Sequence, residues 1–202
     1  MSVYQFSEWF LALFFSFVAV FYTINITLKK RRFKQASLAT MGTPFSLHWW
    51  NHATFHLFRV LIWGLCVVRI AYPEVDVVLG KFDLLFIPLL QIVGMVFMLI
   101  GFSLAGVSGR DLQHNWRSGI YLDKPKTLVK SGVYRISRNP AFSGVILAQL
   151  GFFMVLPSIF TLVCLAVGVL SLRIQVMLEE NHLSNLFGEQ YTRYAQSTPR
   201  WF

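Results

Sequence analysis

Residues 139–180 read NPAFSGVILAQLGFFMVLPSIFTLVCLAVGVLSLRIQVMLEE, two apolar runs that meet at a proline and end at two acids. Asn139 is a favoured residue just before a helix and Pro140 suits the first helical position, so a helix is predicted to begin there. Pro157 is expected in a tight turn between the runs. Such long apolar runs favour helices that cross a bilayer, because lipid offers no partner for an open backbone.

The rest of the chain is also rich in apolar runs that could cross a membrane. Of its 202 residues, 55% are hydrophobic and 13% are charged, whereas soluble domains carry about a quarter charged residues. Five apolar windows approach the length of a membrane span, namely 7–28, 53–72, 84–104, 141–156 and 158–178. We therefore expect an all-α, polytopic membrane protein with about five transmembrane helices. It would form a single membrane domain, with helices 1–3 in 1–104 and helices 4–5 in 105–202.

Basic residues set the expected orientation. KKRRFK at 29–34 follows the first span, 110–138 holds seven Lys or Arg, and the loop 73–83 has one lysine against three acids. The positive-inside rule then places the N-terminus outside and the C-terminus in the cytosol. Membrane flanks account for the net charge of +9, which argues against nucleic acid as a partner. Because the chain is compact, we expect a bacterial inner membrane.

The start of the predicted fourth helix is a candidate anion site. Free N–H groups in its first turn, with Arg135 and Arg138 just before it, favour a negatively charged ligand. The alternative is that these arginines only fix the membrane orientation.

Glu179 and Glu180 make a second candidate, since the helix dipole and the positive-inside rule both disfavour acids there. The alternative is a solvated pair balanced by Arg173. A pocket with an anion-binding end and a cation-binding end suits a zwitterionic amino-acid group.

Two segments, LVKSGVYRISRNPAFSG at 128–144 and EENHLSNLFGEQYTRY at 179–194, resemble the isoprenylcysteine carboxyl methyltransferase and phospholipid methyltransferase family. The resemblance covers about 112–200 and depends on an ordered set of matches. The matching positions are Arg138, Asn139, Pro140, Phe142, Gly144, Glu179, Glu180, Phe187, Gly188 and Tyr191.

This resemblance implies an integral membrane enzyme that uses S-adenosylmethionine to methylate a lipid-like or lipidated substrate at the cytosolic face. The C-terminal half, 105–202, would form the cofactor pocket. The implied cofactor-binding positions are Lys126, Thr127, Leu128, Val129, Tyr134, Arg138, Asn139, Pro140, Ala141, Phe142, Glu179 and Glu180. Methyl transfer needs alignment rather than a protein nucleophile, so no catalytic residue and no metal is expected.

The chain departs from the family pattern at three positions. Asn139 replaces a histidine and Phe142 replaces a tyrosine. Gln175 stands where the prenylcysteine enzymes carry an arginine that is thought to face the substrate carboxylate. Gln175 and the nearby Arg173 are the candidate substrate-binding positions, although two residues along a helix face different ways. The acceptor stays open between an isoprenylcysteine-like carboxylate, which needs no base, and a phospholipid amine headgroup, which does.

Two other functions remain as alternatives. Membrane sterol reductases share a similar C-terminal hairpin and bind a reduced nicotinamide phosphate, but they show basic residues where this chain has its glutamate pair. A non-enzymatic membrane scaffold or transporter subunit would use the polar segments as partner surfaces.

Two features lie outside the resemblance. His48, His52 and His56 share one helical face, but no Asp, Glu or Cys completes a metal site, so an interfacial helix leading into the second span is the preferred interpretation. Arg59 lies deep in that span, where a charge is often functional and otherwise needs a structural partner. Arg69 lies nearer a span end, from which it can reach the interface.

Overall fold

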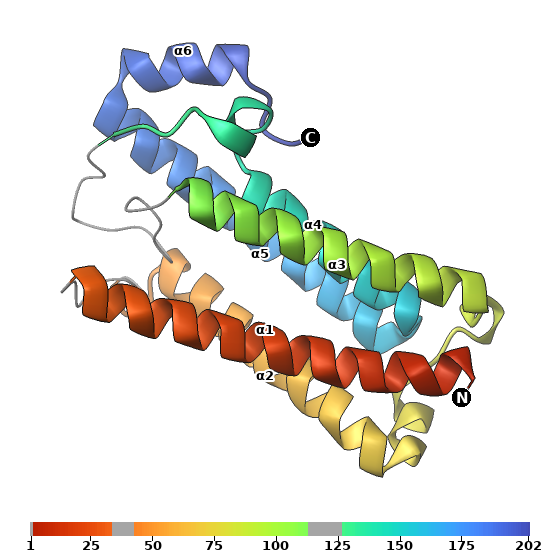
Figure 1. Cartoon of the computed structure of the whole chain (residues 1–202). Helices are drawn as coiled ribbons and strands as arrows, with labels where there is room; N and C mark the ends of the chain where they lie inside the picture. Colours follow the sequence, from red (N-terminus) through yellow and green to blue (C-terminus); the bar gives the residue numbers. More distant parts are fainter. Residues whose placement is uncertain (1, 34–42, 113–126) are drawn as a thin grey trace.

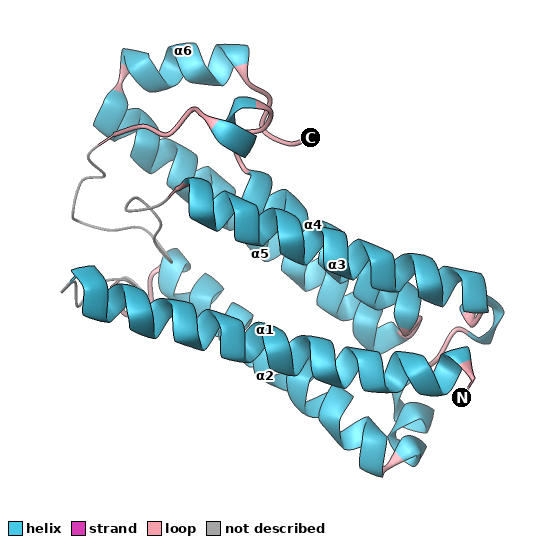
Figure 2. Ribbon diagram, viewed as in Figure 1, coloured by secondary structure: helices cyan, strands magenta, loops and turns pink. Residues whose placement is uncertain are grey.

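The computed structural model describes residues 2–33, 43–112 and 127–202, and nearly all of them are helical (Figures 1 and 2). The α-helices are α1 (Val3–Phe33), α2 (Leu47–Ala71), α3 (Pro88–Asp111), α4 (Pro140–Val155), α5 (Ile159–Phe187) and α6 (Glu189–Ser197). Short 3₁₀ turns are η1 (Pro73–Leu79), η2 (Asp83–Leu85) and η4 (Gly132–Arg135). The predicted all-α membrane fold is confirmed.

Four helices, α1, α2, α3 and α5, are long and apolar enough to cross a membrane. Helix α4 has 16 residues and rises about 24 Å, which is short of a hydrocarbon core of about 30 Å. Pro157 lies in the α4–α5 turn, where its carbonyl accepts a hydrogen bond from the Phe82 N–H at 3.0 Å.

Two predicted boundaries need correction. The histidine stretch forms the first turns of α2, which begins at Leu47 after Ser46 rather than at 53 and continues into the second span. The Ser46 hydroxyl accepts a hydrogen bond from the Trp49 N–H at 3.1 Å and so caps the helix six residues before the predicted span. Helix α3 begins at Pro88 rather than at 84, because proline suits the first helical position.

Helices α3 and α4 pack antiparallel through facing glycines. A Cβ atom added at Gly94 would lie 2.7 Å from the Gly151 carbonyl oxygen, and one added at Gly101 would collide with Gly144. Both pairs are spaced seven residues apart, so they lie on one stripe of each helix. Small residues allow the backbones to touch, and such contact drives helix association in lipid, where hydrophobic burial contributes little.

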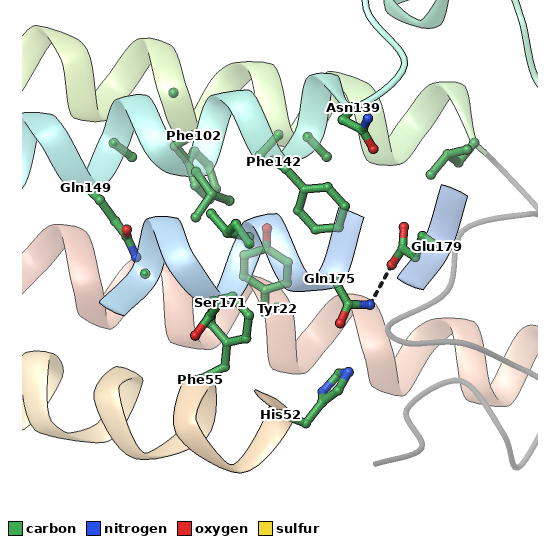
Figure 3. A pocket seen from close by; sticks show the side chains of 18 of the residues that line it. Tyr22, His52, Phe55, Phe102, Asn139, Phe142, Gln149, Ser171, Gln175 and Glu179 are labelled. Atoms are coloured by element: carbon green, nitrogen blue, oxygen red, sulfur yellow. Dashed lines mark hydrogen bonds between the residues drawn. The ribbon is translucent and has the colours of Figure 1, made fainter. Parts of the chain in front are cut away.

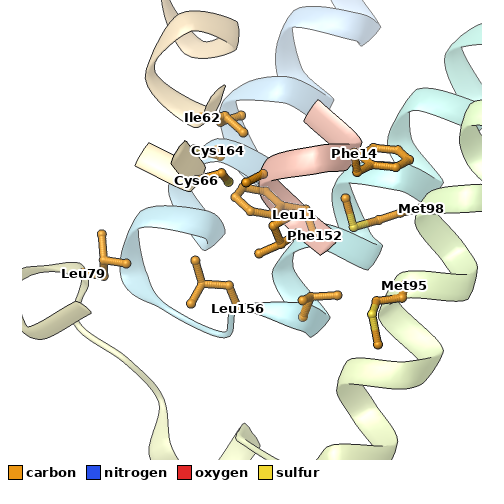
Figure 4. Close-up of a cluster of buried hydrophobic side chains, with 12 residues drawn as sticks. Leu11, Phe14, Ile62, Cys66, Leu79, Met95, Met98, Phe152, Leu156 and Cys164 are labelled. Atoms are coloured by element: carbon orange, nitrogen blue, oxygen red, sulfur yellow. The ribbon is translucent and has the colours of Figure 1, made fainter. Parts of the chain in front are cut away.

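The helices converge at the end of the bundle that holds η1 and the α4–α5 turn, called here the hairpin end. Figure 4 shows the buried cluster there, to which helices α1 to α5 and η1 contribute. Its members are Leu11, Ala12, Phe14, Ile62, Cys66, Leu79, Met95, Met98, Phe152, Val155, Leu156 and Cys164. At the opposite end, called the α6 end, the layer of α1 and α2 separates from the layer of α3, α4 and α5 (Figure 1).

A buried ion cluster ties η1 to α1 and α2 at the hairpin end. Asp76, which is 4% exposed, accepts hydrogen bonds from the Arg69 guanidinium and the Tyr4 hydroxyl. The Lys81 ammonium lies 2.6 Å from the same carboxylate. Burial alone would raise the pKa of Asp76, but the hydrogen bonds from Arg69, Lys81 and Tyr4 outweigh it and hold this pKa well below its usual range.

We predict that Gly101→Ala lowers the thermal unfolding midpoint in detergent, because the new methyl group separates α3 from α4. Overpacking of this kind typically removes about 1–3 kcal/mol of stability. Gly106→Ala is the matched control on the same helix, since a Cβ there meets nothing within 4 Å. Equal midpoints for the two variants would contradict the close packing of α3 and α4.

We predict that Asp76→Asn destabilises the protein at pH 7 and that the deficit shrinks as the solution becomes acidic. Folding lowers the pKa of Asp76, so its stabilisation is complete above the unfolded value of about 3.9 and is lost as pH falls below it. Unfolding midpoints from pH 7 to pH 3 would show the wild type and Asp76→Asn converging. Asp83→Asn, at an exposed site, is the control; a deficit that grows in acid would oppose this interpretation.

Candidate functional site

A cavity of about 460 Å³ lies between the two helix layers, within the size range of small-molecule sites. Its polar mouth is at the α6 end, where Asn139 and Glu179 line it (Figure 3). Its apolar floor includes Phe14 and Phe152 of the buried cluster. The cavity therefore joins a polar compartment to one that suits an alkyl chain.

The structure brings most of the predicted cofactor-binding residues together around this mouth. Lining residues among them are Thr127, Leu128, Val129, Tyr134, Arg138, Asn139, Ala141, Phe142, Glu179 and Glu180. Gln175 also lines the cavity, whereas Pro140 is fully buried beside it. Arg173 is exposed and is not among the lining residues, and Lys126 lies outside the described residues.

Helix α4 begins at Pro140 as predicted, but Asn139 does not cap it with its side chain. The Asn139 amide instead donates to Glu180 Oε1 at 2.9 Å and to the Arg200 carbonyl at 3.3 Å. This asparagine therefore links the start of α4 to α5 and to the C-terminal segment.

Glu180 is the centre of a charged cluster and is 8% exposed. Its Oε2 accepts hydrogen bonds from Arg200 at 2.8 and 3.1 Å, and its Oε1 lies 3.5 Å from Arg138 Nε. With the Asn139 contact, both oxygens are occupied by groups of the protein. Glu180 therefore holds the site together rather than offering a free carboxylate.

Glu179 has other hydrogen-bond partners than Glu180, because successive helix residues point about 100° apart. Its Oε1 accepts a hydrogen bond from Gln175 Nε2 at 2.8 Å, drawn in Figure 3. The Gln175 oxygen in turn accepts from Asn51 at 3.3 Å, and Asn51 donates to the Ser171 carbonyl at 3.1 Å. This chain of amides positions the carboxyl group of Glu179, which lines the cavity.

Helix α6 and the segment after it hold the wall of the mouth in place. The Tyr194 hydroxyl donates to the Tyr134 carbonyl at 2.6 Å, and the Arg138 N–H donates to the Pro199 carbonyl at 2.9 Å. Burial raises the pKa of Tyr134, and the nearby charge of Glu179 adds to the effect, so its phenol stays neutral.

The layer of α1 and α2, which the sequence did not assign to the pocket, supplies the opposite wall. Tyr22 on α1 lines the cavity together with His52, Phe55 and Arg59 on α2. In the sequence, Arg59 was the available sign that α2 lines the cavity, because a charge inside a span needs a partner or a role. Nearly all-apolar helices give no further sign of which face lines a cavity.

Comparison with known proteins adds the following. A model of the phospholipid methyltransferase family matches residues 89–190, about half of the chain, from α3 into α6. The chain is similar to Protein-S-isoprenylcysteine O-methyltransferase B of Arabidopsis thaliana, with 32% identity over 93 residues. That match spans 46% of this chain and 46% of the length of the plant protein. No solved structure matches.

We predict that Glu180→Gln lowers the thermal unfolding midpoint by several degrees, because it leaves Arg138 and Arg200 facing each other without a carboxylate. Breaking a buried ion pair typically removes about 3–5 kcal/mol, and the lower end applies because Arg200 is half exposed. Glu189→Gln breaks the exposed pair with Arg193 and is the control. If both substitutions shift the midpoint equally, Glu180 does not hold the site together.

Proposed function

Because the chain belongs to the phospholipid methyltransferase family, we propose that it transfers a methyl group from S-adenosylmethionine to a lipid-like or lipidated acceptor. The observation that carries the proposal is the single cavity that has Arg138 and Glu179 at its mouth and an apolar floor. A polar donor and an apolar acceptor can meet in such a space without leaving the membrane.

The residues at the mouth fit the donor. The Glu179 oxygen that accepts no hydrogen bond from the described residues suits its ammonium group, and Arg138, which lines the same cavity beside Glu180, suits its carboxylate. Tyr134 and Phe142 offer rings to the adenosine portion, and the backbone of 127–129 offers polar atoms. These two charges are the two ends expected of a pocket for a zwitterionic amino-acid group.

S-adenosylmethionine, when bound, would supply a methyl group on a sulfonium, with the neutral thioether S-adenosylhomocysteine as the leaving group. The protein contributes the alignment of donor and acceptor and the exclusion of water from the reacting atoms. The amide chain from Asn51 through Gln175 fixes Glu179, and thereby the depth at which the donor is held. Aromatic side chains around the cavity, such as Phe102 and Phe142, keep water from the acceptor (Figure 3).

The acceptor is proposed as either an isoprenylcysteine-like carboxylate or a phospholipid headgroup, the two classes that the comparisons name. An amine headgroup must lose a proton before it attacks. His52 lines the cavity on the side facing Gln175, and its Nε2 has no hydrogen-bond partner in the described residues. His52 is therefore the proposed base if the acceptor is an amine.

The α6 end is proposed to face the cytosol, and the membrane to be a bacterial inner membrane. The described parts of the two basic segments, 29–33, 110–112 and 127–138, lie at this end of the bundle, whereas the acidic loop 73–83 lies at the hairpin end. The positive-inside rule favours that orientation.

We predict that the detergent-purified protein binds S-adenosylhomocysteine in calorimetry and that Glu179→Ala weakens this binding about 10-fold or more. A buried charge-assisted hydrogen bond of about 1.5–3 kcal/mol is lost. Glu189→Ala, at an exposed position of α6, is the control and should bind as the wild type does.

A second titration with a reduced nicotinamide dinucleotide phosphate separates the alternatives. Binding of that cofactor in place of S-adenosylhomocysteine would favour a reductase. Binding of neither ligand would leave a membrane scaffold or transporter subunit as the better hypothesis.

A further inference from the structure

Arg59 is a charged residue at mid-height in the bundle. It lies twelve residues from each end of α2, about 18 Å along the helix from either end. It nevertheless lines the cavity. A charge at this depth is too far from both interfaces to be explained as a residue that reaches the lipid headgroups, and such charges commonly mark a functional site.

The structure gives Arg59 no counter-ion among the described residues, in contrast to the other arginines near the cavity or the buried cluster. Arg69 pairs with Asp76, while Arg138 and Arg200 pair with Glu180. Tyr22 of α1 lies close enough to Arg59 to interact electrostatically, but its phenol is neutral at ordinary pH. Arg59 therefore faces the cavity with its positive charge uncompensated.

The direction of the side chain is set by the helix. Side chains of an α-helix lean toward its N-terminus, and the N-terminus of α2 is at the α6 end. From this rule we expect the Arg59 side chain to extend toward the compartment that contains Glu179, rather than into the floor. The chain thus places the Glu179 carboxyl at the mouth and the Arg59 guanidinium farther down.

A second polar group lies in the deep part of the cavity. Gln149 of α4 lines it, and its Oε1 is buried without a hydrogen-bond partner in the described residues. Its amide fits against α5 only because Gly168 has no side chain, since an added Cβ would collide with it. A buried, unsatisfied amide is expensive, and rotation of this amide would present its NH₂ group to a ligand oxygen.

We propose that Arg59 binds the anionic group of the lipid acceptor and so selects lipids that carry an oxyanion. This inference rests on the proposed function, because it assigns a substrate contact within the same cavity. The guanidinium has the fork geometry that pairs with phosphate or carboxylate oxygens. Gln149 on the facing wall and the Tyr22 hydroxyl on the same wall as Arg59 are neutral groups that line the cavity.

The shared chemistry is an oxyanion on an apolar chain, and two sources supply it. One is the phosphodiester of a phospholipid, and the other is the carboxylate of a prenylated cysteine. The probes are therefore two matched pairs: dioleoyl phosphatidylethanolamine against dioleoylglycerol, and farnesylcysteine against its methyl ester. In each pair only the first member carries the anionic group; the first pair also differs in the ammonium group of the headgroup, which a guanidinium does not attract.

Binding of the four probes to wild type, Arg59→Gln and Arg59→Lys would be measured by microscale thermophoresis in detergent. Arg59→Gln should weaken binding of at least one anionic probe about 10-fold or more and leave its uncharged partner unchanged. Arg59→Lys should weaken this binding less, since lysine keeps the positive charge but lacks the forked guanidinium. The anionic probe that responds identifies the source.

Arg193→Gln is the control for charge, because Arg193 is exposed on α6. It should bind all four probes as the wild type does. Equal binding of the anionic probes by wild type and Arg59→Gln would overturn the proposal. So would equal weakening of charged and uncharged probes, which indicates a structural role. If Arg59→Gln does not fold, Arg59→Lys is compared with the wild type instead. Selective weakening of an anionic probe then supports the proposal, and equal binding of the anionic probes overturns it.

Binding of S-adenosylhomocysteine separates this inference from the proposed function. Arg59→Gln should bind it as the wild type does, because Arg59 lies below the mouth. If the wild type does not bind it but Arg59→Gln still loses the anionic probe selectively, the methyltransferase proposal falls and an anionic-lipid site at Arg59 stands.

Discussion

The contact between the backbones of α3 and α4 is the constraint on which the site depends. Gly94 faces Gly151 and Gly101 faces Gly144, so the two helices cannot slide without a collision or a gap. In lipid, where burial of apolar surface contributes little, such close contact is what fixes a helix at one depth. The depth of α4 in turn sets the level at which its first residues meet Glu180 of α5.

The same bundle closes at one end and opens at the other. At the hairpin end, the buried cluster and the ion pairs around Asp76 join all the long helices. At the α6 end, the layer of α1 and α2 parts from the other three helices and the cavity lies between them. The dense core at the hairpin end holds the two layers together. It offsets the contacts that are missing at the α6 end, so the cavity can stay open in the folded protein.

Sequence reasoning located the polar end of the site because that end has local signals. A helix start at Asn139–Pro140 and two acids after a span are readable from single positions. The division of roles between Glu179 and Glu180 was not readable, since it depends on the C-terminal segment that brings Arg200 to one of them. The wall formed by α1 and α2 was also missed. Uniformly apolar helices have no polar face, and only the isolated Arg59 and the row with His52 marked the side toward the cavity.

The charges that remain in the cavity explain why a folded chain would keep features that oppose its own stability. Among the described residues, Glu180 pairs with two arginines, whereas Arg59 has no counter-ion and the Glu179 carboxyl has only an amide. Leaving charges without counter-ions in a region of low dielectric destabilises the protein unless a ligand compensates them. The two charges are opposite in sign and lie at different depths, so one small ion cannot satisfy both. A donor with an ammonium group at the mouth and a lipid with an oxyanion below it would satisfy both, and their order in the cavity would then bring their reacting ends together.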